Sequence, residues 1–170
     1  MQDNKMTTPN KKATKELINS IHKKYLYAAK SAINAGADVN ARDENETPIL
    51  LIAVQHGNLD IVKSLIDAGA DVNMHDDGWT PLMTATFNGH TAIVQELINA
   101  HANVNAIDND GGTALITATV TNRADIIRLL LSAGADINIK DNDGLTALDI
   151  AKNNHCGEII ALFKNHQTLI

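Results

Sequence analysis

Apolar residues occur along this chain in short groups with helical spacing, and a polar turn follows each group. Between residues 91 and 99, Ile93, Val94, Leu97 and Ile98 recur at intervals that place them on one face of a helix. Two further segments have the same grouping, as Ile61, Val62, Leu65 and Ile66 and as Ile126, Ile127, Leu130 and Leu131. These positions predict amphipathic helices whose apolar faces supply most of a shared core.

The polar turn after each of these helices has a nearly constant sequence. One copy runs from Ala68 to Asn73 and contains Gly69, which suits the left-handed conformation that commonly ends a helix. The closing asparagine recurs at positions 40, 73, 105 and 138, so the spacings are 33, 32 and 33 residues. A period of this size indicates a stack of repeated structural units.

A second, shorter helix is predicted within each period. Thr80 is a residue type that caps helix N-termini, and Pro81 suits the first helical position, where no backbone N–H is required. Asn88 and Gly89 then break this helix before the next one begins. Each unit therefore has the order turn, helix, break, helix and turn.

This unit resembles the ankyrin repeat, which has a period of about 33 residues and the signature Thr-Pro-Leu-His-x-Ala. Residues 80–85 match the signature except that Met83 replaces the histidine, and residues 113–118 and 146–151 match it more loosely. In the first full repeat, Thr47 and Pro48 stand one residue further from the signature alanine. The resemblance covers residues 14–165. It implies an all-α ankyrin-repeat solenoid of helix-turn-helix units with β-turn or hairpin fingers, about five repeats including degenerate caps.

The domain boundaries follow from the period. We expect a disordered N-terminal lead over residues 1–13, since this segment is polar and lacks periodicity, and then a single ankyrin-repeat domain over 14–166. The domain comprises a cap (14–40), three repeats (41–73, 74–105 and 106–138) and a C-terminal cap repeat (139–166). Asn73 stands 12 positions before Ala85, whereas Asn40 stands 13 before Ala53, so the finger of the second full repeat should differ in shape.

Composition narrows the possible partners and the compartment. Hydrophobic residues make up 44% of the chain and aromatic residues only 3%, so the core must be built from aliphatic side chains. A net charge of −6 disfavours nucleic acid and anionic membranes as partners, and no apolar run approaches the ~18 residues of a membrane span. Cys156 is the only cysteine, which favours a reducing compartment. We expect a cytoplasmic protein, with secretion into a host cell without a classical signal peptide as the alternative.

The candidate chemical motifs do not support catalysis. The run Asp-Asn-Asp-Gly at 108–111 and 141–144 places its glycine too early for a calcium-binding EF-hand loop and is typical of a turn. The seven histidines form no metal-binding spacing, and Cys156 next to His155 lacks the third group of a nucleophilic site. We therefore expect no enzyme activity, no metal and no cofactor.

The repeated asparagines at 40, 73, 105 and 138 have two interpretations. The resemblance implies a possible modification site, because turn asparagines of this family can be hydroxylated in animal cells. The alternative, which we favour, is that each asparagine stabilises its own turn.

The resemblance also implies that a partner binds the concave face, which the fingertips and the exposed side of the first helices form. The candidate partner-binding residues are Trp79, Phe87, Met83, Met74, His75, Asp77, Asn109, Val120 and Leu145. Trp79 is the only tryptophan, and the spacing to Met83 and Phe87 predicts that the three share a face. The alternative is that Trp79 packs against the neighbouring finger and Phe87 fills the groove between repeats. Acidic fingertips favour a partner with some positive charge.

The predicted function is that of a non-catalytic protein–protein interaction module, which binds an as yet unknown protein through a rigid, preformed surface. Two alternatives remain open: a dedicated inhibitor or regulatory subunit of one enzyme, and a bacterial effector that acts on host proteins. The polar residues of the end repeats disfavour self-association through the ends, and we expect a monomer.

Overall fold

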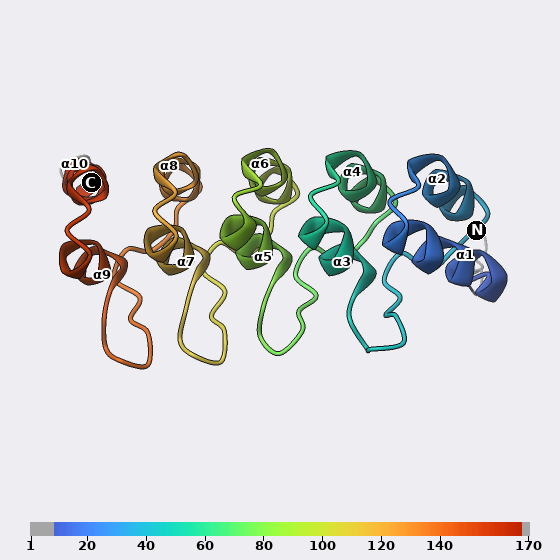
Figure 1. Ribbon diagram of the computed structural model, residues 1–170, viewed down its shortest axis with the longest axis horizontal. Coiled ribbons are helices and arrows are strands. Elements are labelled where there is room, and N and C mark those ends of the chain that lie inside the picture. The colour runs from blue at the N-terminus through green and yellow to red at the C-terminus, as the bar shows by residue number, and fades with distance from the viewer. Residues whose placement is uncertain (1–8, 168–170) are drawn as a thin grey trace, which may run out of the picture. The chain divides into compact units, whose positions relative to one another are not determined.

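The computed structural model describes residues 9–167 of the 170-residue chain. In this part the helices come in pairs, each pair is joined by a short break, and longer polar loops lead from one pair to the next (Figure 1). The chain divides into two compact units, residues 1–71 and 72–170. We call them the N-terminal and the C-terminal unit and describe each by itself. The predicted all-helical fold of paired helices with hairpin fingers is confirmed.

The N-terminal unit contains two helix pairs. Its helices are α1 (Lys11–His22), α2 (Leu26–Asn34), α3 (Ile49–Gln55) and α4 (Leu59–Asp67). Each helix packs against its pair mate, and in addition α1 packs against α3 and α2 against α4. The contacts are made by fully buried aliphatic side chains, among them Leu17, Ile21, Ile49, Ile61 and Leu65. The core of this unit is therefore aliphatic, as the composition predicts.

The first helix begins earlier than predicted. The side chain of Asn10 accepts hydrogen bonds from the backbone N–H groups of Lys12 and Ala13, and this cap starts α1 at Lys11. Ala13 is also buried, with 2% of its surface exposed. The prediction of a disordered lead is therefore wrong for the helical residues 11–13, and its residues 1–8 lie outside the described part of the chain.

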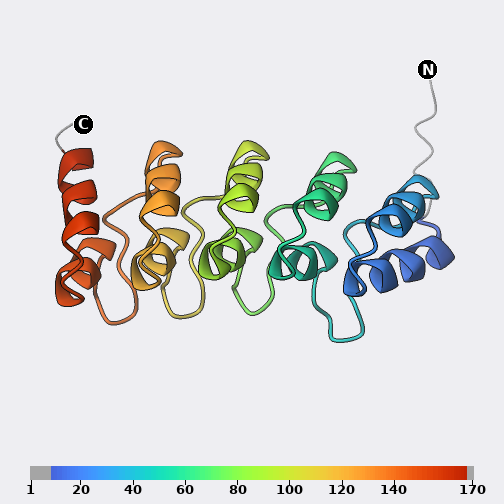
Figure 2. The ribbon, with the colours of Figure 1, turned by 45° about the horizontal axis from the view of Figure 1, so that its top comes forward.

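The C-terminal unit contains three helix pairs. Its helices are α5 (Pro81–Asn88), α6 (Thr91–Asn99), α7 (Ala114–Val120), α8 (Ala124–Ser132), α9 (Ala147–Asn153) and α10 (Gly157–Gln167). The first helices of the pairs, α5, α7 and α9, pack in order, and α6, α8 and α10 form a second row (Figure 2). Among the described helices of the whole chain, none is long and apolar enough to cross a membrane. The predicted division of the chain into a single domain over 14–166 stays a prediction.

The predicted helix starts are confirmed in this unit. Thr80, Thr113 and Thr146 each accept a hydrogen bond from the backbone N–H three residues later, and Pro81 occupies the first turn of α5. Gly89 ends α5 with a φ of 71°, a left-handed conformation in which glycine avoids the strain of a side chain. Capping thus fixes where these short helices begin and end.

The polar loops before α3, α5, α7 and α9 (residues 41–48, 74–80, 106–113 and 139–146) are called fingers below. In the finger before α7, Asp108 Oδ1 accepts hydrogen bonds from the backbone N–H groups of Asp110 and Gly112, at 2.9 and 2.7 Å. Asp43 and Asp141 make the same pair of bonds in their own fingers. An aspartate that bonds its own turn therefore shapes these loops.

The finger before α5 is different, as its missing residue predicts. Asp76 and Trp79 exchange backbone hydrogen bonds of 3.1 and 2.8 Å, so only Asp77 and Gly78 remain in the turn. Both have positive φ angles, 45° and 83°. This is the primed two-residue hairpin turn, which suits the Asp-Gly sequence. The prediction of a finger with a different shape is confirmed.

The repeated turn asparagines mostly bond the next turn rather than their own. The side chain of Asn105 donates to the carbonyl of Gly134 at 3.3 Å and accepts from the N–H of Asp136 at 2.8 Å. Asn40 and Asn73 also accept from the backbone of the following turn, at Asp71 and Asn103. Asn138 instead bonds Asp136 of its own turn. The interpretation that each asparagine stabilises its own turn is therefore wrong for the first three, which join successive repeats.

Candidate functional site

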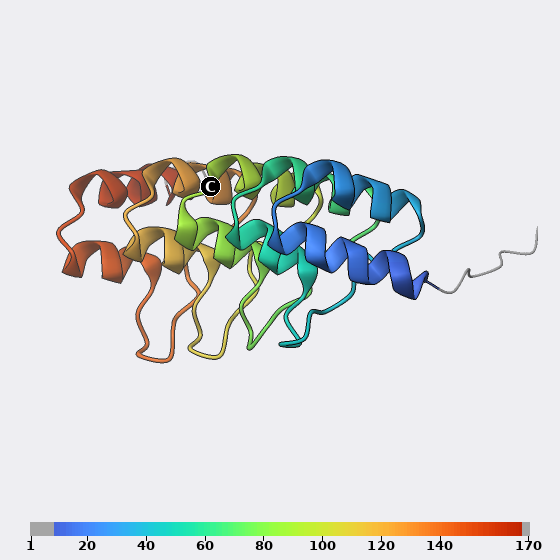
Figure 3. The ribbon, with the colours of Figure 1, turned by 45° about the vertical axis from the view of Figure 1, so that its right-hand side comes forward.

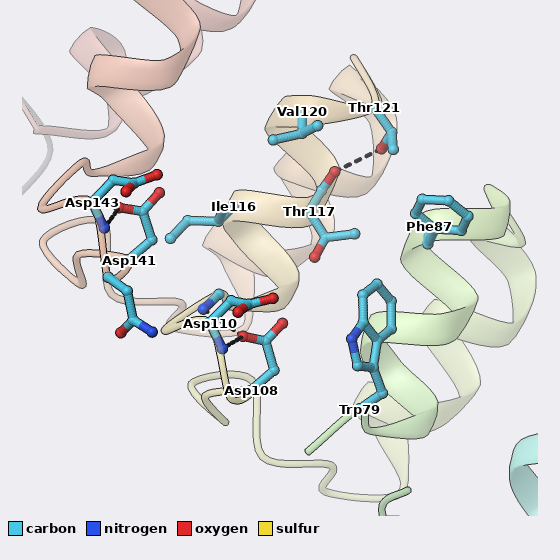
Figure 4. A pocket seen from close by; sticks show the side chains of 12 residues that line it. Trp79, Phe87, Asp108, Asp110, Ile116, Thr117, Val120, Thr121, Asp141 and Asp143 are labelled. Carbon is cyan, nitrogen blue, oxygen red and sulfur yellow. Dashed lines mark hydrogen bonds between the residues drawn. The ribbon is translucent and has the colours of Figure 1, made fainter. Parts of the chain in front are cut away.

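A groove with a volume of about 460 Å³ lies on the C-terminal unit, along the exposed side of α5 and α7 and against the last two fingers (Figure 4). Its apolar side chains are Trp79, Phe87, Ile116 and Val120. Its acidic side chains are Asp108, Asp110, Asp141 and Asp143. Aromatic and acidic groups thus face the same open space.

Trp79 and Phe87 form one side of the groove. Their rings meet edge to face, with centroids 5.9 Å apart and an interplanar angle of 88°. Phe87 is 55% exposed and Trp79 is half-buried, although both are large apolar side chains. The alternative that Phe87 fills a groove between repeats is wrong, because more than half of its surface is open to solvent. The edge-to-face contact is a favourable geometry for two aromatic rings, and it joins the exposed ring of Phe87 to the half-buried indole of Trp79.

The backbone of Trp79 is fixed on both sides. Before it, the reciprocal hydrogen bonds with Asp76 close the two-residue turn. After it, Thr80 caps α5 by accepting from the N–H of Met83 at 3.2 Å. The backbone that carries the indole is therefore held by hydrogen bonds on both sides, and the ring itself contacts Phe87.

Ile116 and Val120 of α7 continue the apolar surface. Val120 is 58% exposed, and it stands seven residues after its helix cap, as Phe87 does in α5. Ile116 is only 7% exposed and forms the floor. Thr117 of α7 and Thr121, the residue that follows this helix, also line the groove (Figure 4). The groove therefore has an apolar base with a few hydroxyl groups.

The four aspartates of the groove divide into two kinds. Asp108 and Asp141 are half-buried, and one oxygen of each accepts two backbone hydrogen bonds of its own finger. Asp110 and Asp143 are exposed, and no described residue donates a hydrogen bond to their carboxylates or forms an ion pair with them. The second kind has its negative charge available to a ligand.

Hydrogen bonds between neighbouring fingers keep these carboxylates in place. The side chain of Asn142 donates to the carbonyl of Asn109 at 3.0 Å, and its backbone N–H donates to the carbonyl of Asp110 at 2.9 Å. In the same way Asn109 donates to the carbonyl of Asp77 at 3.0 Å. The three fingers of this unit therefore lie side by side on one side of the helices (Figure 3).

The structure brings three of the predicted site residues into the groove: Trp79, Phe87 and Val120. Five others lie on the fingers without lining it. Met74 and Leu145 are half-buried, whereas His75, Asp77 and Asn109 are exposed. The side-chain amide of Asn109 also has a structural role, because it donates a hydrogen bond to the carbonyl of Asp77 in the preceding finger.

The prediction that Met83 contacts a partner is wrong, because Met83 is 1% exposed. Met83 and Phe87 are four residues apart on α5 and so share a helix face. The position three residues after the N-cap is also buried in two other repeats, with Leu51 at 8% and Ile116 at 7% exposed, whereas Asp149 at this position of α9 is half-buried.

The sequence prediction missed the four aspartates of the groove. Asp108, Asp110, Asp141 and Asp143 belong to the two copies of Asp-Asn-Asp-Gly, which the prediction assigned to turns alone. The turn assignment is correct for Asp108 and Asp141. The signal for the other two was the repetition itself, since a run that recurs after 33 residues places its side chains on adjacent fingers.

A separate polar cluster lies in the N-terminal unit. His22 Nε2 lies 3.2 Å from the carboxylate of Asp43, which is almost fully buried. Burial alone would raise the pKa of Asp43, but hydrogen bonds from Asn45 and Thr47 outweigh it and lower the pKa. Burial lowers the pKa of His56, the charges of Lys24 and His22 lower it further, and its Nδ1 is buried without a hydrogen bond from any described group.

Within residues 9–167, no three His, Cys, Asp or Glu side chains converge on a position that could hold a metal ion. Cys156 is half-exposed, and its thiol donates a weak hydrogen bond to the carbonyl of Asn154 at 3.6 Å.

Two overlapping parts of the chain, residues 17–108 and 87–168, match the family model described as ankyrin repeats (3 copies). Together the matches cover nearly all of the described residues. None of the curated proteins with which the sequence was compared matches it.

Proposed function

The chain belongs to the ankyrin repeat family, and we propose that it is a non-catalytic module that binds a partner protein in the groove of the C-terminal unit. Ankyrin repeats generally mediate protein–protein interactions. The observation that carries the proposal is the aromatic pair of the half-buried Trp79 and the exposed Phe87, which lies with Val120 in a groove of about 460 Å³.

Exposure of these side chains favours a binding role over a structural one. Phe87 and Val120 leave more than half of their surface in water although the core of the unit is otherwise well buried. Covering an apolar side chain stabilises a complex by about 25 cal/mol per Å² of apolar surface. Tryptophan is also among the residue types that most often dominate binding energy at protein interfaces.

Rigidity of the groove supports tight binding by a preformed surface. Trp79 is fixed between its hairpin and the cap of α5, and Asn109 and Asn142 join the fingers. A surface that is ordered before binding avoids the entropic penalty of ordering loops in the complex. We infer that the module acts in the cytoplasm, where its single thiol, Cys156, stays reduced.

Affinity capture tests the proposal. The protein is immobilised and exposed to lysate from its source organism and, separately, from animal cells, and the retained proteins are compared with those retained by Trp79→Ala/Phe87→Ala. We expect one main partner whose affinity falls at least ~30-fold in the double variant, the effect of losing a central aromatic contact. The animal-cell arm also tests whether the partner is a host protein.

A matched control removes two aromatic side chains elsewhere. Tyr25 and Tyr27 are 61% and 89% exposed on the N-terminal unit, so Tyr25→Ala/Tyr27→Ala deletes similar surface away from the groove. Capture should be unchanged in this variant. A partner that is lost with the tyrosines but kept without Trp79 and Phe87 would refute the assigned groove. Circular dichroism of both variants shows whether the fold is intact.

A further inference from the structure

We propose that the occupant of the groove is an arginine-bearing segment of the partner, with a guanidinium group placed between Trp79 and the carboxylate of Asp110. This inference rests on the proposed function and specifies the chemistry of the partner. The juxtaposition that motivates it is visible in Figure 4, where the aromatic pair lies on one side of the groove and the aspartates of two fingers on the other.

The charge of the groove has one sign. Four of the side chains that line it are carboxylates, and none of the described lining residues is Lys, Arg or His. Asp110 and Asp143 are exposed and have no cationic neighbour within ion-pair distance in the described structure. An anionic or neutral polar occupant would leave these charges uncompensated once the groove is covered, which is unfavourable. The occupant must therefore bring positive charge.

Because the carboxylates are spread along the groove, they favour a peptide with several basic side chains over a single bound ion. No three acidic groups in the described part of the structure converge closely enough to hold a metal. Instead the acids come in two pairs on successive fingers, which the backbone and side-chain bonds of Asn142 hold next to each other. An extended peptide with basic side chains at intervals matches such a row.

The apolar part of the groove selects the kind of cation. Val120 and Ile116 offer an aliphatic surface between the charged fingers and the aromatic pair, which suits the methylene stem of a long basic side chain. The planar guanidinium of arginine stacks on tryptophan and donates paired hydrogen bonds to a carboxylate, whereas the lysine ammonium is a compact, strongly hydrated charge. Arginine therefore fits the combination of Trp79 with Asp110 better than lysine does.

The first step of the test is selection from an immobilised library of random peptides about 12 residues long. The peptides that the protein retains are sequenced. We expect arginine to be enriched at two or more positions, interspersed with aliphatic residues. Enrichment of acidic or purely apolar sequences would overturn the inference.

The second step measures the best peptide through the fluorescence of Trp79, the only tryptophan of the chain. The expected result is a saturable change whose affinity falls as the salt concentration rises from about 50 to about 200 mM, because salt screens exposed charges. Replacing the arginines of the peptide by glutamine should abolish the change. Replacing them by lysine should weaken it.

Two charge variants locate the contact. Asp110→Asn/Asp143→Asn should weaken the peptide roughly threefold to thirtyfold, the range expected for two exposed ion pairs. Asp60→Asn/Asp67→Asn removes the same net charge from exposed positions on α4 and should leave the affinity unchanged. Equal effects of the two variants would show that only the net charge matters and would overturn the assigned contact.

The remaining outcomes separate this inference from the proposed function. Spermine is titrated in parallel, and binding as tight as that of the peptide would identify a small polyamine as the ligand instead. A cellular partner that depends on Trp79 and Phe87 but not on Asp110, Asp143 or salt would refute the arginine inference and leave the binding module in place. Binding to Trp79→Ala/Phe87→Ala is measured by the change in mobility of the peptide, because this variant lacks the fluorescent tryptophan. An arginine peptide that binds this variant as tightly as the unchanged protein would refute both the arginine inference and the proposed function.

Discussion

The amide of Asn105 should contribute measurably to stability because it joins two repeats. Asn105→Ala removes its bonds to Gly134 at 3.3 Å and to Asp136 at 2.8 Å. A hydrogen bond of this kind contributes about 0.5–1.5 kcal/mol net, and the longer bond belongs at the lower end of that range. We therefore expect the free energy of unfolding to fall by about 1–2 kcal/mol.

The substitution isolates the side-chain bonds. Asn105 is not among the residues with positive φ, so alanine fits its backbone without strain. The backbone bond from Asn105 N–H to Asn103 remains, because it does not involve the side chain of Asn105. The lost free energy therefore reports the link between the two turns.

The measurement is urea unfolding followed by circular dichroism. With an m-value of about 2 kcal/mol per molar urea, the midpoint should fall by about 0.5–1 M. Asn138→Ala is the matched control, because the side chain of Asn138 bonds only Asp136 in its own turn at 3.0 Å, and we expect a smaller shift. Equal shifts in the two variants would refute the role of Asn105 as a link between repeats.

Three further predictions concern the core, two glycines in turns and the pH dependence. Leu97→Ala deletes a fully buried side chain of α6 and should lower the free energy of unfolding by about 2–5 kcal/mol in the same urea assay; an unchanged midpoint would contradict its burial. Gly134→Ala should cost about 1–2 kcal/mol, since its φ is 85° and a Cβ would meet no atom within 4 Å. Gly111→Ala should lower the free energy of unfolding more than Gly134→Ala does, since its φ is 76° and a Cβ would lie 2.9 Å from Asn142 N and Asp141 Cα in the next finger. Equal losses for the two variants would show that the two fingers can separate to accept the methyl group. The pKa of His56 in the folded protein lies below its ordinary value of 6.5, so the unfolded chain binds more protons as the pH falls through 6.5. The contribution of His56 to stability is therefore present above pH 6.5. It is lost as the pH falls towards the folded pKa. The melting temperature should therefore fall between pH 7.5 and pH 5, and it should fall less in His56→Gln; identical slopes in the two proteins would contradict the assignment.

Much of the fold could be predicted because the signals that define it are local and repeat. Thr80, Thr113 and Thr146 cap their helices as their residue type indicates, and the missing residue before Ala85 correctly predicted a finger of different shape. The start of α1 was missed because it depends on one residue, Asn10, within an otherwise polar segment. One capping residue is a weak signal for a helix in a segment whose polar composition is typical of a disordered terminus.

The groove was predicted only in part because its composition depends on neighbouring repeats. Trp79 and Phe87 were identified by residue type and spacing, but the same spacing wrongly included Met83. Nothing in the sequence of α5 alone indicates that Met83 is buried whereas Phe87 is exposed. Asp110 and Asp143 were missed for a related reason, since each belongs to an ordinary turn and becomes part of a charged row only when the fingers lie side by side.

The two-residue turn at Asp77 and Gly78 has a consequence for how such a protein acquires new partners. Thr80 caps α5 just as Thr113 caps α7, although the finger before α5 is one residue shorter. The residue before the cap is Trp79 in one repeat, Gly112 in the next and Leu145 in the last. A deletion in a finger is thus absorbed within the loop, while the helices and their caps persist. Specificity can therefore change by insertion, deletion or substitution at the fingers without redesign of the core, and a grafted finger should carry its recognition properties with it.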